Sequence, residues 1–273
     1  MHHGNSTWRK IDRLIARLLL ITALFGLAAS AQAQCTQPVY LTIDTGHMGV
    51  ATLFSEVLQR QKVRATFFIA NEKTLTGGSS LDDQWAPWWR ARAAEGHAFG
   101  SHTFDHAYWL ADLPSGLRIK PSQGPHAGKI QEWSAARYCE ELNRSAERFK
   151  EMTGQSMPRL FRAPGGKTSP ALLKAAASCG YVHVPWSPAG FLGDELPSDR
   201  YPNDQLLQRA LRDIRPGDIL LAHLGIWSRQ DPWAPVVFEP LIEGLKAKGY
   251  CFATLRDHPI YGAAFRDTSG KSK

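Results

Sequence analysis

The chain has 273 residues, of which 43% are hydrophobic, 21% charged and 10% aromatic, with a formal net charge of +7. This composition is typical of a globular protein and excludes a fully disordered chain, a collagen-like chain and a small disulfide scaffold. The length permits one barrel-sized domain. Much of the positive charge lies near the start, and no run of Lys and Arg follows it. The charge therefore does not favour nucleic acid as a partner.

The first 33 residues are typical of a secretory signal. A basic stretch ends at Arg17, an apolar run covers residues 18–27, and residues 31–33 (AQA) match the small-x-small cleavage pattern. The apolar run is shorter than the roughly 20 residues of a membrane-spanning helix. We therefore expect cleavage, no stable membrane anchor, and an exported protein in the periplasm or outside the cell. The alternative is an uncleaved anchor.

Strand and helix patterns alternate behind this segment. Short runs rich in β-branched and aromatic residues predict seven strands, at residues 39–44, 65–70, 97–101, 160–162, 181–184, 218–222 and 250–255. Helical spacing predicts six helices, at residues 50–61, 85–95, 130–153, 169–179, 204–214 and 236–248.

This alternation predicts an α/β fold with a parallel sheet and outer helices, either a closed barrel or a doubly wound sheet. We expect a single domain over residues 34–266 and a flexible polar tail over residues 267–273. Residues 107–129 contain Pro and Gly without periodicity, which predicts a long loop or insertion.

Four cysteines lie behind the signal segment. An even number in an oxidising compartment predicts two disulfides, and three connectivities are open. We favour Cys35–Cys251, which would tie the opening segment to the last strand, and Cys139–Cys179, which would tie neighbouring helices. The alternative is four buried thiols.

Titratable or cationic side chains follow four of the predicted strands. Asp44 ends the first strand, His102 and His106 follow the third, Arg162 ends the fourth and His223 follows the sixth. Active residues of parallel α/β folds gather at the carboxyl ends of the strands. Two imidazoles four residues apart would share one side of a helical turn, as two metal ligands need. The sequence therefore predicts a metal site at this rim.

Four motifs in chain order resemble those of the polysaccharide deacetylases, carbohydrate esterase family four. Residues 41–46 (LTIDTG) resemble the first family motif, residues 101–106 (SHTFDH) the second, residues 161–166 (FRAPGG) the third and residues 221–223 (LAH) the fifth. The resemblance covers roughly residues 36–256. It implies a distorted (β/α)7 barrel that removes an acetyl group from a sugar with the help of a divalent metal.

The resemblance also implies a role for each matched residue. Asp44 would be the general base, Arg162 would orient it, and His223 would be the general acid. His102 and His106 would bind the divalent metal, for which zinc is the first candidate. The chemistry is coherent, because amide hydrolysis needs an activated water, a polarised carbonyl and a protonated leaving amine.

Further matched or neighbouring residues would contact the substrate. The backbone N–H of Gly165 would help to bind the oxyanion, and Leu221 belongs to the fifth motif. Trp186 would stack on a sugar ring or, equally, belong to the core. The fourth family motif is poorly matched, and Asp194 lies just beyond it as a candidate to hold the acid histidine.

The chain departs from the family pattern at residue 45. Thr45 stands where the family has a metal-binding aspartate, and a hydroxyl is a poorer metal ligand than a carboxylate. A water molecule could complete the metal site, or His47 could reach into it; alternatively, His47 is a plain loop histidine.

The sequence thus predicts an exported, metal-dependent hydrolase that removes acetyl groups from an N-acetylated amino sugar in a polysaccharide or cell-wall glycan. Its expected partner is that glycan. Two alternatives remain open: a catalytically silent carbohydrate-binding barrel, and a deacylase of a small non-glycan amide.

Overall fold

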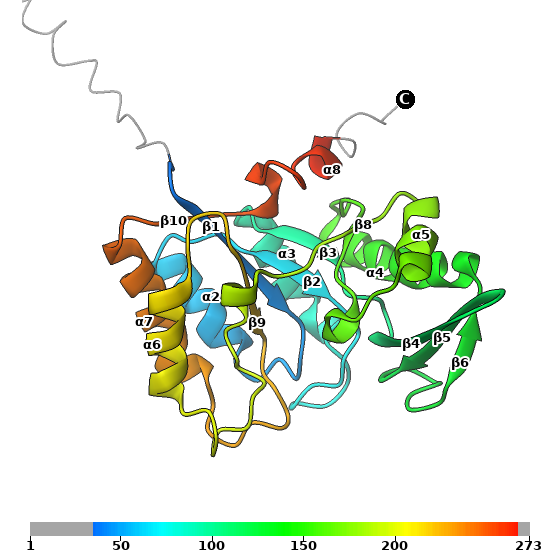
Figure 1. Cartoon of the computed structure of the whole chain (residues 1–273), viewed down its shortest axis with the longest axis horizontal. Coiled ribbons are helices and arrows are strands. Elements are labelled where there is room, and N and C mark those ends of the chain that lie inside the picture. Colours follow the sequence, from blue (N-terminus) through cyan, green and yellow to red (C-terminus); the bar gives the residue numbers. More distant parts are fainter. Residues whose placement is uncertain (1–34, 267–273) are drawn as a thin grey trace, which may run out of the picture. The chain divides into compact units, whose positions relative to one another are not determined.

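The computed structural model describes residues 35–266, drawn in colour in Figure 1. The expected signal segment and polar tail lie outside the described residues. The main sheet contains seven parallel strands: β1 (Pro38–Asp44), β2 (Thr66–Ile69), β3 (Ala98–Ser101), β7 (Leu160–Phe161), β8 (Val182–His183), β9 (Ile219–His223) and β10 (Cys251–Ala253). A second sheet contains three antiparallel strands: β4 (Ala107–Leu113), β5 (Gly116–Pro121) and β6 (Gln131–Trp133).

Helices connect the strands of the main sheet. They are α2 (Ala51–Arg60), α3 (Ala86–Ala94), α4 (Ala135–Thr153), α5 (Pro170–Ser178), α6 (Asn203–Asp213) and α7 (Ala234–Ala247), and the short α8 (Ala263–Arg266) follows the last strand. The longest, α4, begins where the Ser134 hydroxyl accepts a hydrogen bond from the N–H of Arg137, and it ends at Gly154 in the left-handed conformation. None of the helices within residues 35–266 is long and apolar enough to cross a membrane.

Strand β1 lies at the centre of the main sheet. It pairs in parallel with β10 up to Tyr40, with β9 from Tyr40 to Asp44, and with β2 from Thr42 to Asp44. The sheet continues from β2 through β3 and β7 to β8. Beyond β8 it curves back to β9 through irregular backbone only, where Phe191 forms an isolated bridge with Leu221. The predicted distorted parallel barrel is therefore confirmed, as a half-open form.

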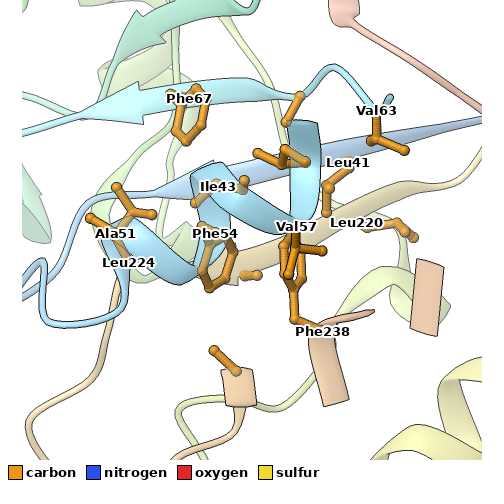
Figure 2. Close-up of a cluster of buried hydrophobic side chains, with 14 of the residues drawn as sticks. Leu41, Ile43, Ala51, Phe54, Val57, Val63, Phe67, Leu220, Leu224 and Phe238 are labelled. Atoms are coloured by element: carbon orange, nitrogen blue, oxygen red, sulfur yellow. The ribbon is translucent and has the colours of Figure 1, made fainter. Parts of the chain in front are cut away.

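The main core lies between the sheet and the outer helices α2 and α7. Leu41 and Ile43 of β1 pack against Phe54 and Val57 of α2 (Figure 2). The ring of Phe54 stacks on Phe238 of α7 with centroids 4.0 Å apart. Because β1 is covered on both faces, its sequence is an almost continuous apolar run, and this core holds its carboxyl end in place.

The prediction of an irregular segment over residues 107–129 was wrong. This stretch forms most of the antiparallel sheet, which packs beside α4 and α5 at one side of the molecule (Figure 1). In β5, Leu117, Ile119 and Pro121 are buried and alternate with exposed residues. This period of two is a strand signal, and the Pro and Gly residues lie at the two ends of β5 or in the turns beside it. The helix expected from residue 130 begins at Ala135, because β6 occupies the residues before it.

Both favoured disulfides are confirmed. Cys35 is bonded to Cys251, which ties the start of the described chain to β10. Cys139 of α4 is bonded to Cys179, which directly follows α5, across a sequence separation of 40 residues. The second bond therefore connects the helix that precedes β7 in the sequence with the helix that follows it.

We expect the double substitution Cys139→Ala and Cys179→Ala to lower the free energy of unfolding by about 2–4 kcal/mol, because the bond restricts a long loop of the unfolded chain. Urea denaturation under oxidising conditions measures the change. A control measurement adds a reductant to the wild-type protein, whose stability should then fall as well. An unchanged unfolding free energy in the double variant would contradict this role of the disulfide.

Candidate active site

A cavity of about 350 Å³ lies at the carboxyl ends of the strands in the main sheet. It is lined by eight of the eleven residues singled out in the sequence: Asp44, Thr45, His102, His106, Gly165, Trp186, Leu221 and His223. Of the other three, Arg162 pairs with Asp44, Asp194 pairs with His223, and His47 lines a neighbouring cavity. The carboxyl ends of parallel strands meet at one rim of the sheet, and this topology places side chains up to 179 residues apart in the chain around one cavity.

Asp44 is held by a buried ion pair. Arg162 Nη1 donates to Asp44 Oδ1 at 2.8 Å, and its Nε donates to the carbonyl of Val184 at 3.2 Å. Both charged side chains are almost completely buried. Burial raises the pKa of Asp44, but the positive charge of Arg162, with smaller effects from nearby imidazoles, outweighs burial and leaves the pKa below its usual value. Asp44 is therefore a carboxylate at neutral pH, with one oxygen fixed by Arg162.

The two imidazoles lie side by side, with ring centroids 4.9 Å apart. His102 Nδ1 lies 2.9 Å from the carbonyl of Arg162, and His106 Nδ1 lies 2.8 Å from the hydroxyl of Ser122. Each ring thus has its Nδ1 engaged by the protein, which fixes its orientation. His102 Nε2 lies 3.4 Å from Asp44 Oδ2. Burial lowers the pKa of His102 to about 4, so its ring is neutral at pH 7 and its free nitrogen is a donor for a metal.

The turn that carries the two imidazoles is not helical, contrary to the geometry assumed from the spacing. Thr103 and His106 have φ angles of 60° and 47°, in the left-handed region that non-glycine residues seldom adopt. Two hydrogen bonds hold this conformation: the Thr103 hydroxyl accepts from the N–H of Ala107 at 2.7 Å, and the N–H of His102 donates to Ile69 of β2 at 2.9 Å. Such strained backbone gathers at functional sites.

The two imidazoles fit a divalent metal of the zinc type in donor chemistry and orientation. Catalytic zinc sites use three protein ligands and keep one open position. A third ligand is not in place, because no three His, Cys, Asp or Glu side chains within residues 35–266 are grouped closely enough to hold an ion. Thr45 lines the cavity, but its hydroxyl accepts a hydrogen bond from the N–H of Ala70 at 3.0 Å.

His223 lines the cavity from the end of β9, next to Asp44 in the strand register, and has a carboxylate partner of its own. Its Nδ1 lies 3.1 Å from Asp194 Oδ1, and its backbone N–H donates to Asp194 Oδ2 at 2.7 Å. Its Nε2 lies 4.0 Å from a Glu195 carboxylate oxygen. Burial lowers the pKa of His223, but the negative charges of Asp194, Asp44 and Glu195 outweigh burial and raise the pKa to about 10. The structure therefore brings Asp194 to the place expected for a partner of this histidine, which is protonated at neutral pH.

Two glycines leave room for the aromatic rings of Trp186 and Tyr108, which line the cavity. Gly165 and Gly166 have φ angles of 63° and 66°. A Cβ atom on Gly166 would lie 2.4 Å from the Trp186 ring, and a Cβ on Gly165 would lie 3.1 Å from the Tyr108 ring. A larger residue at position 166 would displace the Trp186 ring, and one at position 165 would crowd the Tyr108 ring. Trp186 lines the cavity beside Leu221, so its ring is available to a bound molecule.

His47 lies outside the cavity that holds the two imidazoles. Its Nδ1 accepts from the N–H of Gly49 at 3.0 Å, and its ring contacts Trp227 edge-on with centroids 5.2 Å apart. It lines a neighbouring cavity of about 280 Å³ instead. The structure does not bring His47 to His102 and His106.

Several cavity residues carry no motif and were missed in the sequence. Glu72 follows the end of β2, and Glu195 follows Asp194. Tyr108 comes from β4 of the antiparallel sheet, and Ser122 and Gln123 directly follow β5. The charge of Glu72 just after a predicted strand was a signal of the same kind as Asp44. The other three could not be found once their segment had been assigned to a loop.

Comparison with known proteins gives consistent matches. A family model described as polysaccharide deacetylase matches residues 31–184. A chitooligosaccharide deacetylase from Azorhizobium caulinodans is 28% identical over 202 residues, which cover 72% of this chain and 78% of that protein.

Solved structures agree in fold. A peptidoglycan N-acetylglucosamine deacetylase has a TM-score of 0.61 at 22% identity, over 81% of this chain and 87% of that chain. A carbohydrate esterase family 4 pseudoenzyme from Bacillus anthracis has a TM-score of 0.58 at 20% identity, over 81% and 65% of the two chains. At these identities the likeness establishes the fold alone.

We expect Asp194→Asn to lower the pKa of His223 by about 1–3 units, because the substitution removes the nearest negative charge and keeps the side-chain shape. NMR titration of the His223 ring measures this pKa. Glu195→Gln is the matched control, with a smaller expected shift, because Glu195 lies farther from the ring. Equal shifts in the two variants would contradict the assignment of Asp194 as the main partner.

Proposed function

The chain belongs to the polysaccharide deacetylase family, and from this membership we propose that it is an exported, metal-dependent hydrolase of N-acetylated amino sugars in a polysaccharide or cell-wall glycan. One observation carries the proposal: an ionised Asp44 and a protonated His223 face one cavity that also holds two oriented imidazoles. These are the charge states that a general base and a general acid need at neutral pH.

In the proposed reaction, water attacks the acetamide carbonyl and the carbon–nitrogen bond breaks, which releases acetate and a free amine. Asp44 takes a proton from the water, while Arg162 keeps the carboxylate in place. His223 gives a proton to the leaving nitrogen, and Asp194 keeps its ring oriented. The N–H of Gly165 is the proposed oxyanion donor.

Members of this family generally use a divalent metal. In this chain His102 and His106 are the residues that would hold it, and we take zinc as the first candidate. The bound ion would polarise the carbonyl and lower the pKa of the attacking water.

The walls of the cavity support a sugar as substrate. Trp186 and Tyr108 offer aromatic faces, and Trp227 is exposed at the edge. Glu72 and Glu195 add negative charge, which suits a neutral N-acetylated sugar and its cationic amine product better than an anionic substrate. Chito-oligosaccharides, on which a relative acts by name, are therefore the first substrates to test.

Two features of the chain support export. The first 33 residues match a secretory signal, and all four cysteines form disulfides, which persist in oxidising compartments. Sequencing of the mature amino terminus from the producing cell tests this part of the proposal: a start near Gln34 is expected, and an intact Met1 would contradict it.

A catalytically silent carbohydrate-binding barrel is the second candidate. The observation that favours it is the missing third metal ligand among residues 35–266. The two candidates differ in one result, because a silent barrel would bind chito-oligosaccharides without releasing acetate.

We expect Asp44→Asn to reduce acetate release from chito-oligosaccharides by at least about 100-fold while zinc still binds, because an amide cannot accept the proton of the water. Acetate assay and calorimetry measure the two effects separately. Asp213→Asn, on the exposed end of α6, is the control and should keep the wild-type rate. A substantial rate in Asp44→Asn would remove Asp44 from the role of base.

We expect His102→Ala to lose both zinc binding and acetate release, since a site with only two imidazoles has no ligand to spare. Calorimetric titration with zinc measures the affinity, and thermal unfolding shows whether the variant is folded. Full zinc occupancy in a folded His102→Ala protein would refute the ligand assignment.

A further inference from the structure

The metal site proposed above has two nitrogen donors and needs one more protein ligand. Side-chain oxygen atoms of this cavity come from few acidic or hydroxyl-bearing residues: Asp44, Thr45, Glu72, Tyr108, Ser122, Glu195 and Ser228. These side chains differ in whether their oxygen atoms already have hydrogen-bond partners and in whether they carry a charge.

Most of these side chains are already engaged. Arg162 holds one oxygen of Asp44, and the Ser122 hydroxyl contacts His106 Nδ1 at 2.8 Å. The Thr45 hydroxyl accepts from Ala70 and carries no charge. Glu195 lies 4.0 Å from His223 Nε2, and its side chain is 44% exposed.

Glu72 is the exception. Its Oε2 atom is buried and has no hydrogen-bond partner within residues 35–266. A buried carboxylate oxygen without a donor is costly, because it has lost its hydration and gained nothing in return. An oxygen of this kind, in a cavity lined by two imidazoles whose Nδ1 atoms are already engaged by the protein, is a candidate ligand for a cation.

The backbone that carries Glu72 is fixed next to the imidazole turn. The N–H of Glu72 donates to the Ser80 hydroxyl at 2.9 Å, and its carbonyl accepts from the N–H of Ser80 at 2.7 Å. The adjacent N–H of Asn71 donates to the carbonyl of Phe104, between the two histidines in the chain, at 2.7 Å. Glu72 lines the same cavity as His102 and His106, but the three side chains are not grouped around an ion site in the described residues 35–266. To bind the ion, the carboxylate would rotate about its own side-chain bonds.

We propose that Glu72 is the third protein ligand of the divalent metal held by His102 and His106, and that it supplies the carboxylate that Thr45 cannot. The inference rests on the proposed metal-dependent function. Two imidazoles and one glutamate form a ligand set that catalytic zinc is known to use. The arrangement leaves Thr45 free for its structural hydrogen bond to Ala70.

Zinc titration of the metal-free mature protein tests the proposal. We expect Glu72→Gln to weaken zinc binding at least about tenfold, since even residues that only hydrogen-bond to a metal ligand contribute 10–100-fold. The matched control is Glu195→Gln, which removes the same charge from the same cavity and should change the affinity much less. Thermal unfolding without metal shows that both variants are folded.

Two further measurements distinguish direct binding of the metal by Glu72 from a general effect of its negative charge. Cobalt(II) absorption should change in Glu72→Gln and not in Glu195→Gln, because the spectrum reports the atoms bound to the ion. Thr45→Asp, added to Glu72→Gln, should restore much of the zinc affinity by returning a carboxylate to the site.

Wild-type zinc affinity in a folded Glu72→Gln protein, or an equal loss in the two glutamate variants, would overturn the inference while the proposed hydrolysis stands. A wild-type protein that binds no zinc would overturn both. If Glu72→Gln does not fold, Glu72→Asp, which keeps the charge but shortens the side chain, should still bind zinc more weakly than the wild type, and equal affinity would count against the proposal.

Discussion

The buried ion pair between Asp44 and Arg162 is the constraint on which the site depends. It joins the end of the central strand β1 to the residue directly after β7, and both side chains are almost fully buried. Desolvation makes such a pair expensive, and removal of one partner typically costs about 3–5 kcal/mol because the other charge is left unpaired. The pair therefore survives only in a fold whose strands end at fixed positions, which the packing of β1 against α2 and α7 ensures.

The ion pair between Asp44 and Arg162 also affects the other titratable side chains of the cavity. The carbonyl of Arg162 engages His102 Nδ1, so the residue that fixes the carboxylate also orients the first imidazole. The charge of Asp44 in turn contributes to the high pKa of His223, its register partner on the neighbouring strand β9. One buried pair thus links the proposed base Asp44, the imidazole of His102 and the proposed acid His223, and a disturbance at Arg162 would reach all three.

The sequence was sufficient for the parts of the molecule that follow simple periodicity. Alternating strand and helix patterns predicted the parallel barrel, and the rule of strand ends placed Asp44, Arg162 and His223 at one rim before any geometry was known. The helix expected over residues 169–179 is α5, which Ser169 caps by accepting from the N–H of Leu172. These features are local or follow from the topology, so a single sequence contains them.

Features that depend on three-dimensional context were not accessible in this way. The antiparallel sheet was missed because the alternation of Leu117 and Ile119 is short and lies between turn residues. The turn carrying His102 and His106 departs from a helix through positive φ angles that no sequence spacing reveals. Glu72 has no motif, and its significance rests on an unpaired buried oxygen, which only the packed structure shows.

Acetate release from chito-oligosaccharides by the purified wild-type protein, before chelation, after chelation and after addition of zinc, tests the central claim most directly. The account predicts release that is lost on removal of the metal and recovered when zinc is returned. Equal release from the chelated protein would contradict the metal-dependent mechanism, and glycan binding by zinc-loaded protein without acetate release would show that the barrel is catalytically silent.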